Sequence, residues 1–149
     1  MSKPAAVPFE TTAFVRDHCL CLHAQRAARA LSRRFDAALR PLGLTSGQFS
    51  LMMSLNRPEP AGMGSVAALL GLDRTTLTAA LKPLERRRLV ASRAHRDDKR
   101  SRLLTLTPQG RALLAQAVPI WTATHAEVDR VLEAHDAAEL RPALLALGR

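Results

Sequence analysis

The sequence predicts a mainly α-helical fold with one small β-hairpin. Apolar residues recur at spacings of three and four over most of the chain, whereas two short segments read as strands. Apolar residues make up 47% of the 149 residues, which is enough for a buried core, so we expect one folded domain with appended helices. The chain has four Phe, one Trp and no Tyr, and its core must therefore consist of aliphatic side chains.

The N-terminal part is predicted to be an arm followed by a long helix. Residues 1–10 contain two prolines and little periodicity, which indicates a flexible arm. Residues 11–39 carry a helical apolar stripe, and Pro41 and Gly43 end this helix. No segment resembles a signal peptide or a membrane span, so we expect a cytoplasmic protein.

Start and stop signals divide the next region into three helices. Thr45 and Gln48 have the spacing of a capping box and open the first of them. Ser65 is expected to cap a short helix that Gly71 ends, and Asp73 is expected to cap the next one. Two short helices joined by a tight turn that contains glycine indicate a helix-turn-helix.

After this pair the periodicity changes. Residues 90–93 and 102–106 are predicted to be strands, and the polar, mostly basic residues 94–101 join them as the tip of a hairpin. Thr107 and Pro108 then start a long helix that runs to about Glu133.

The C-terminal part is predicted to be helical. Pro119 is expected to kink or break the long helix, because proline lacks a backbone donor. Asp136 and Glu139 open a last helix. The whole pattern corresponds to a winged helix-turn-helix flanked by N- and C-terminal helices.

Positive charge is concentrated in one segment. The chain has a net charge of +9, and residues 82–102 contain nine basic and three acidic residues, a balance of +6. A basic helix followed by a basic hairpin favours a polyanionic partner, and nucleic acid is the first candidate. The alternatives are a soluble basic protein without such a partner and an amphipathic surface helix with a solvated, flexible tip.

The helix from Thr75 to Arg88 is predicted to enter a DNA groove. Its outward face has small residues near the start, which permit close approach, and cations near the end. Pro83 is expected to bend this helix or to mark its end, and Asp98 is expected to orient the Arg100 guanidinium. The predicted DNA-contacting residues are Ser65, Arg74, Thr75, Thr76, Thr78, Lys82, Arg86, Arg93, Arg96, Asp98, Lys99 and Arg100.

The order and spacing of these motifs resemble the MarR family of bacterial transcription regulators. The matching segments are residues 42–49, 69–78, 84–90, 96–100 and 104–110. The resemblance implies a homodimeric repressor that binds a near-palindromic operator in double-stranded DNA, with half-sites about one helical turn apart. It implies that Asp98 and Arg100 occupy the wing's Asp-x-Arg motif and that Arg100 reaches the minor groove. It further implies an intertwined dimerisation region of residues 11–44 and 108–149 around a DNA-binding region of residues 45–107.

The two cysteines suggest that oxidation is one signal to which the protein responds. Cys21 falls at the cysteine position of the family's organic-peroxide-sensing branch, although this chain lacks the tyrosines that support that cysteine. If residues 11–39 form one helix, Cys19 and Cys21 lie on different faces and cannot pair with each other. The alternative places both in an apolar dimer core. With His18 and His23 they do not form one four-ligand set, so we expect no metal and no cofactor.

A small molecule is the other candidate signal. The resemblance implies an aromatic or phenolic ligand in a cleft beside the dimerisation helices, and Phe49, Met52, Met53 and Trp121 are the candidate lining residues. The alternative is that all four are core. Two rival functions are a thiol-dependent enzyme that uses Cys21 and an interaction dimer that does not bind DNA. No phosphate loop or nucleophile elbow is present, so an enzyme is not expected.

Overall fold

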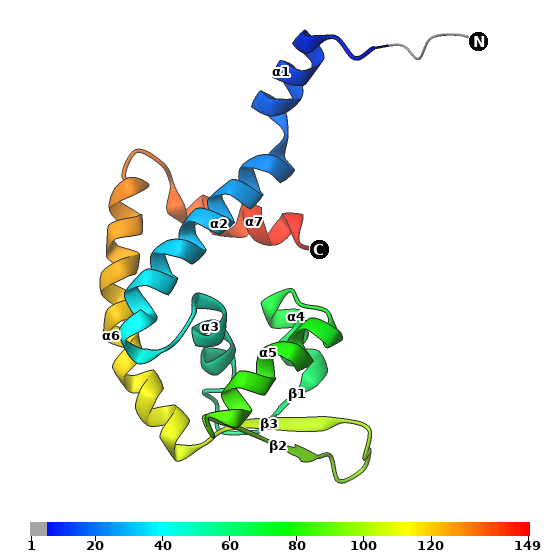
Figure 1. The fold of residues 1–149 in the computed structure, drawn as a ribbon, viewed down its shortest axis with the longest axis vertical. Coiled ribbons are helices and arrows are strands. Elements are labelled where there is room, and N and C mark those ends of the chain that lie inside the picture. The colour runs from blue at the N-terminus through cyan, green and yellow to red at the C-terminus, as the bar shows by residue number, and fades with distance from the viewer. Residues whose placement is uncertain (1–5) are drawn as a thin grey trace, which may run out of the picture.

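The computed structural model describes residues 6–149 as helices around a small sheet (Figure 1). The helices are α1 (Phe9–His18), α2 (Leu20–Leu39), the 3₁₀ turn η1 (Arg40–Leu42), α3 (Ser46–Ser54), α4 (Met63–Leu70), α5 (Arg74–Arg86), α6 (Pro108–Val131) and α7 (Ala137–Leu147). The strands are β1 (Ala61–Gly62), β2 (Val90–Ala94) and β3 (Arg102–Leu106). In the described part of the chain, no helix combines the length and apolar character that crossing a membrane requires.

The predicted helix 11–39 is wrong in one respect, because it is two helices. Cys19 has an extended backbone, with φ −73° and ψ 105°, and its Sγ accepts a hydrogen bond from the Leu22 N–H at 3.4 Å. Cys19 is therefore the N-cap of α2, a position that the sequence marks with neither glycine nor proline. Helix α1 begins within the predicted arm, and residues 1–5 of that arm lie outside the described residues.

Most of the predicted caps are confirmed. Thr45 Oγ1 accepts the Gln48 N–H at 3.1 Å, and Gln48 Oε1 accepts the Thr45 N–H at 3.1 Å. Gly71 ends α4 with φ 65°, and Asp136 caps α7. The prediction for Ser65 is wrong: α4 already begins at Met63, and the Ser65 hydroxyl instead donates to the Gly62 carbonyl.

The predicted hairpin is confirmed and forms two strands of a three-stranded antiparallel sheet in the order β1-β3-β2. Val90 pairs with Leu106 and Ser92 with Leu104, so the side chains of these residues share one face, which is buried at its apolar end. Strand β1 was not predicted, because its two residues pair with β3 more than 40 positions away.

The core forms where the sheet meets α3, α4, α5 and α6. Leu77, Leu81 and Leu84 of α5 are fully buried, which confirms the predicted inward face of this helix. Helix α5 passes through Pro83 and ends at Arg86, while α6 passes through Pro119, so neither proline breaks its helix. The fully buried large side chains are Leu39, Leu51, Met52, Leu55, Leu77, Leu81, Leu84 and Leu104.

Helices α1 and α7 bury none of their residues within this chain. Helix α1 projects away from the body, and α7 follows α6 at the C-terminal end (Figure 1). Large apolar side chains are exposed along α1, α2 and α7, namely Phe9, Phe14, Val15, Leu20, Leu31, Leu140, Leu144, Leu145 and Leu147. A surface of this kind indicates that another molecule covers it.

Replacing Arg88 with glycine is expected to stabilise the fold by about 1 kcal/mol, because Arg88 has a left-handed backbone with φ 56°. Urea-induced unfolding measures the change. Arg88→Ala removes the same side chain while it keeps the strained backbone, and it should give no such gain. If the Arg88→Gly variant unfolds at a lower urea concentration than wild type, the prediction is wrong.

Candidate nucleic-acid interface

The first turn of α5 is fixed by Asp73. Its Oδ1 accepts the Thr76 N–H at 2.7 Å, and its Oδ2 accepts the Thr76 hydroxyl at 2.9 Å. These hydrogen bonds, the backbone one first, hold the pKa of Asp73 below its ordinary value. The carboxylate thus stays ionised at neutral pH and holds the start of α5 in one orientation.

A groove of about 480 Å³ lies between α5 and the hairpin. It joins residues of α4, α5 and β3 to the hairpin tip, and it is lined by Met63, Arg74, Thr75, Thr78, Ala79, Lys82, Arg100 and Arg102. Lys82 and Arg100 therefore share one concave surface, although they are distant in the sequence. This juxtaposition gives a cationic groove with small side chains on one wall.

The predicted threonines have different surroundings. Thr75 and Thr78 line the groove, and the Thr78 hydroxyl donates to the Arg74 carbonyl at 2.8 Å. Thr76 does not line it, since its hydroxyl reinforces the Asp73 cap. Thr75 and Thr78 are thus the two predicted threonines that line the groove.

The hairpin carries three further predicted cations. Arg93 and Arg96 line a separate hollow with His95, and Lys99 is exposed near the end of the tip. The expected Asp98–Arg100 side-chain pair is wrong: Asp98 Oδ1 accepts the backbone N–H of Arg100 at 3.0 Å. Asp98 therefore shapes the turn before Arg100 rather than orienting its guanidinium.

Two further predicted residues lie outside the groove. Ser65 is exposed on α4, and Arg86 is exposed at the end of α5. The sequence reasoning missed Met63 and Arg102, which do line the groove. Arg102 alternates with Leu104 and Leu106 on the inward face of β3, and a cation in that register is the signal that identifies it.

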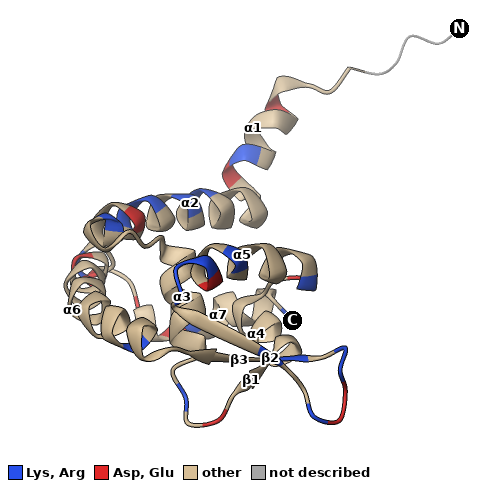
Figure 2. Ribbon diagram, turned by 60° about the horizontal axis from the view of Figure 1, so that its bottom comes forward, with Lys and Arg blue, Asp and Glu red and all other residues tan. Residues whose placement is uncertain are grey.

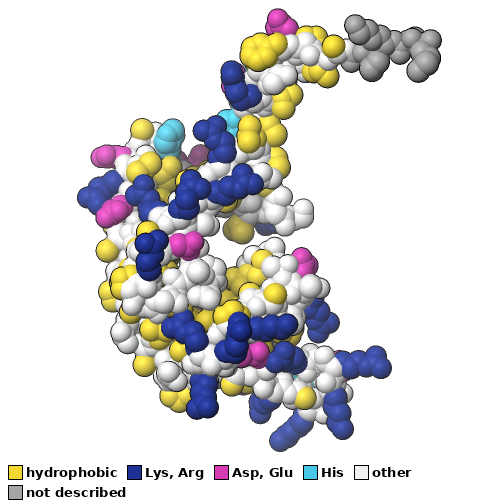
Figure 3. Space-filling view, in the orientation of Figure 1, with side chains coloured by type: hydrophobic (Ala, Val, Ile, Leu, Met, Phe, Trp, Pro, Cys, Tyr) yellow, Lys and Arg dark blue, Asp and Glu magenta, His cyan; other side chains and the backbone are white. Residues whose placement is uncertain are grey.

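Basic side chains gather at this end of the molecule. The hairpin loop carries both basic and acidic residues (Figure 2), and dark blue side chains cluster over α5 and the hairpin in the space-filling view (Figure 3). A second row of basic residues follows α2, where His23, Arg26, Arg29 and Arg33 border a shallow hollow. The first cluster combines a helix and a hairpin and is the candidate nucleic-acid interface.

The two cysteines lie at the junction of α1 and α2. Cys19 is half-buried, whereas Cys21 is exposed and accepts a hydrogen bond from Gln25 Nε2 at 3.3 Å. Since the helix is broken at Cys19, the helical angle used to separate the two thiols does not apply. The rings of His18 and His23 each contact a backbone carbonyl at 2.8 Å, and the described residues contain no group of three metal-ligating side chains.

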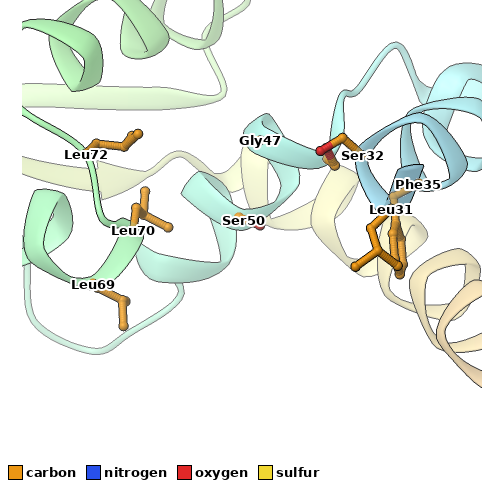
Figure 4. A pocket seen from close by; sticks show the side chains of 9 residues that line it. Leu31, Ser32, Phe35, Gly47, Ser50, Leu69, Leu70 and Leu72 are labelled. Carbon is orange, nitrogen blue, oxygen red and sulfur yellow. The ribbon is translucent and has the colours of Figure 1, made fainter. Parts of the chain in front are cut away.

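Two adjoining hollows lie beside α3. One, of about 450 Å³, separates Leu31, Ser32 and Phe35 of α2 from the leucines around α4, with Gly47 and Ser50 between them (Figure 4).

The other hollow has a volume of about 520 Å³ and is lined by three of the predicted residues, Phe49, Met53 and Trp121. Met52, the fourth predicted residue, is fully buried in the core and does not line it. Ser50, Leu69 and Leu70 border both hollows, and the lining carries hydroxyl groups but no charged side chain.

The chain is similar to known regulators of transcription. Residues 44–101 match the model of the MarR family. The chain is 30% identical over 101 residues to the organic hydroperoxide resistance transcriptional regulator of Bacillus subtilis strain 168, which covers 68% of this chain and 69% of that protein. It is 31% identical over 123 residues to the HTH-type transcriptional repressor Rv2887 of Mycobacterium tuberculosis H37Rv, with coverage of 83% and 88%.

The fold is also similar to that of a solved transcriptional regulator. The M. tuberculosis transcriptional regulator MosR, in complex with DNA, superposes with a TM-score of 0.78 and 39% sequence identity. The match covers 88% of this chain and 94% of that chain, and therefore includes helices on both sides of the hairpin region.

Proposed function

The chain belongs to the MarR family, and on this premise we propose that it is a transcriptional regulator that binds double-stranded DNA sequence-specifically. The observation that carries the proposal is the groove that Arg74 and Lys82 of α5 share with Arg100 of the hairpin. A helix with small residues at its start enters a major groove, while an arginine on the hairpin reaches the adjacent minor groove. The relatives are named as regulators, and we assign this chain no catalytic role.

The regulator acts in the cytoplasm as a homodimer. The exposed apolar side chains of α1, α2 and α7 form the surface that a second copy covers. Residues 11–44 and 108–149 then form the dimerisation region, and residues 45–107 form the DNA-binding region. Two-fold symmetry places two copies of α5 on successive turns of one face of the duplex, which requires a near-palindromic operator.

A footprint tests this function. The purified protein is expected to protect a near-palindromic site in the DNA upstream of its own gene, with two half-sites separated by about one helical turn. Binding should weaken steeply as the salt concentration rises, because cations that contact phosphates release counterions. A protein that remains monomeric and protects no DNA at low ionic strength would refute the proposal.

A small aromatic ligand is one signal that releases DNA. The hollow bordered by Phe49, Met53 and Trp121 lies between α3, α4 and α6, so an occupant shifts the DNA-binding region relative to the dimerisation helices. Trp121, the one tryptophan of the chain, is 37% exposed beside this hollow. Addition of salicylate as a phenolic probe should therefore quench the protein's tryptophan fluorescence and remove the footprint.

Oxidation of Cys21 is the second candidate signal, favoured by its exposure and by the similarity to the hydroperoxide regulator. The Cys21 thiolate attacks one oxygen of an organic hydroperoxide and the O–O bond breaks. Sulfur keeps that oxygen as a sulfenic acid, and the alkoxide leaves and is protonated to the alcohol. A footprint that peroxide removes and reductant restores in wild type, but that persists with peroxide in Cys21→Ser, supports this signal. If peroxide does not change the footprint of the wild-type protein, the small aromatic ligand is the remaining candidate signal.

A further inference from the structure

A cluster of three side chains joins the helix of the groove to the base of the hairpin. Arg102 Nη2 donates to Glu85 Oε1 at 2.7 Å and also contacts Ser92 Oγ, whose hydroxyl donates to the same Glu85 oxygen at 2.8 Å. Glu85 belongs to α5, Ser92 to β2 and Arg102 to β3. Among the described residues, no other side-chain hydrogen bond connects α5 with either strand of the hairpin.

The cluster lies between the apolar core and the hairpin tip. Ser92 and Arg102 share the inward face of the sheet with Leu104, so the cluster begins where the apolar core ends. The ionic side chains are partly shielded, with 27% of Glu85 and 42% of Arg102 exposed. Beyond Arg102 the chain enters the tip, which carries Arg100 into the groove. In the part of the chain that the structure describes, the cluster therefore provides the side-chain hydrogen bonds between α5 and the hairpin that lie nearest the tip.

Charge alone does not explain an acidic residue at this place. Glu85 lies beside cations that attract phosphate, so its charge opposes binding of any DNA. Such a contact can still favour binding to one particular DNA sequence if it fixes the geometry that this sequence requires. An arginine that is already held at a set distance from α5 loses less conformational entropy when it binds.

We propose that Glu85 is a positioning residue for operator recognition: it holds Arg102 and Ser92, and thereby the hairpin, at a fixed distance from α5. This inference rests on the proposed DNA-binding function. Glu85 acts without contacting DNA, and its effect passes through the separation of Lys82 and Arg100. The inference predicts that loss of Glu85 lowers the preference for the operator over random DNA, even though the loss removes a negative charge.

The test compares Glu85→Gln with wild type as full-length dimers. Affinity is measured at one salt concentration for the protected upstream site and for a random duplex of the same length. Operator affinity is expected to fall about tenfold, since each dimer loses two such clusters, while affinity for random duplex stays the same or rises. Asp97→Asn is the matched control: it removes one negative charge from the hairpin tip, where the Asp97 side chain makes no hydrogen bond to α5, and it should leave the ratio of the two affinities unchanged.

A double variant checks that the cluster acts as a unit. If Glu85 works through Arg102, the specificity ratio of Glu85→Gln/Arg102→Gln should be no lower than that of the worse single variant. Thermal unfolding and light scattering confirm that each variant remains a folded dimer. The inference fails if Glu85→Gln changes both affinities in parallel or changes neither. If wild type itself does not prefer the upstream site, the proposed function fails instead.

Discussion

Replacing Gly110 with alanine is expected to destabilise the chain by roughly 3 kcal/mol, because there is no space for a Cβ at this position. An added Cβ would overlap the carbonyl oxygen of Leu89 and lie 3.0 Å from its carbonyl carbon. Both atoms are backbone, so no side chain can rotate away. Thermal and urea unfolding should show a large decrease in stability, with a midpoint about 10 °C lower.

The same contact explains why a shift at this position is costly. The Leu89 carbonyl accepts the Thr107 N–H at 3.1 Å and the Thr107 hydroxyl at 3.2 Å, and Thr107 also caps α6 through the Gly110 N–H. One oxygen therefore joins the end of the α5 segment to the start of α6. A displaced α6 would lose these hydrogen bonds and would change how the DNA-binding region is attached to the dimerisation helices.

Gly64 provides the control for this substitution. It also lies in the first turn of a helix, but a Cβ there would meet no atom within 4 Å. Gly64→Ala should leave stability unchanged or raise it by about 0.5–1 kcal/mol, since alanine favours the helix. If both alanine variants unfold at the wild-type midpoint, the close approach of α6 to Leu89 does not limit stability.

Local signals explain most of what the sequence predicted. The caps at Thr45, Asp73 and Thr107 each act on an N–H three residues along the chain, so residue type and spacing were sufficient. The inward face of α5 followed from its helical period. The groove cations Lys82 and Arg100 were found because a helix-turn-helix followed by a hairpin limits where each can lie.

Most of what the sequence did not predict depends on tertiary contacts. The break at Cys19 has no glycine or proline to mark it, and β1 exists only because β3 pairs with it. Arg102 was read as a strand residue, since its role depends on Glu85, 17 positions earlier. For β1 and Arg102 the deciding partner is distant in sequence, and periodicity within one element contains no information about it. The side-chain cap hydrogen bond at Cys19 is local, from the Leu22 N–H, and cysteine is not among the residues that usually mark a helix start.

Removing the guanidinium of Arg100 is expected to weaken operator binding by roughly a hundredfold. Arg100 lines the same groove as Lys82 and is the tip residue that we propose enters the minor groove. An arginine contact of this kind contributes roughly 1–3 kcal/mol, and a dimer loses two of them in Arg100→Gln. The slope of log affinity against log salt concentration should also become shallower by about two. The reason is that the dimer makes two fewer cation–phosphate contacts and therefore releases fewer counterions when it binds.

Arg40→Gln is the matched control for this measurement. Arg40 carries the same charge and is exposed in the η1 turn after α2, outside the groove. Fluorescence anisotropy with labelled operator, taken at several salt concentrations, should show wild-type affinity and slope for Arg40→Gln. Equal losses in both variants would mean that net charge alone drives binding. A loss confined to Arg100→Gln means that the position of the cation relative to α5 determines affinity, which is the geometry that Glu85 maintains.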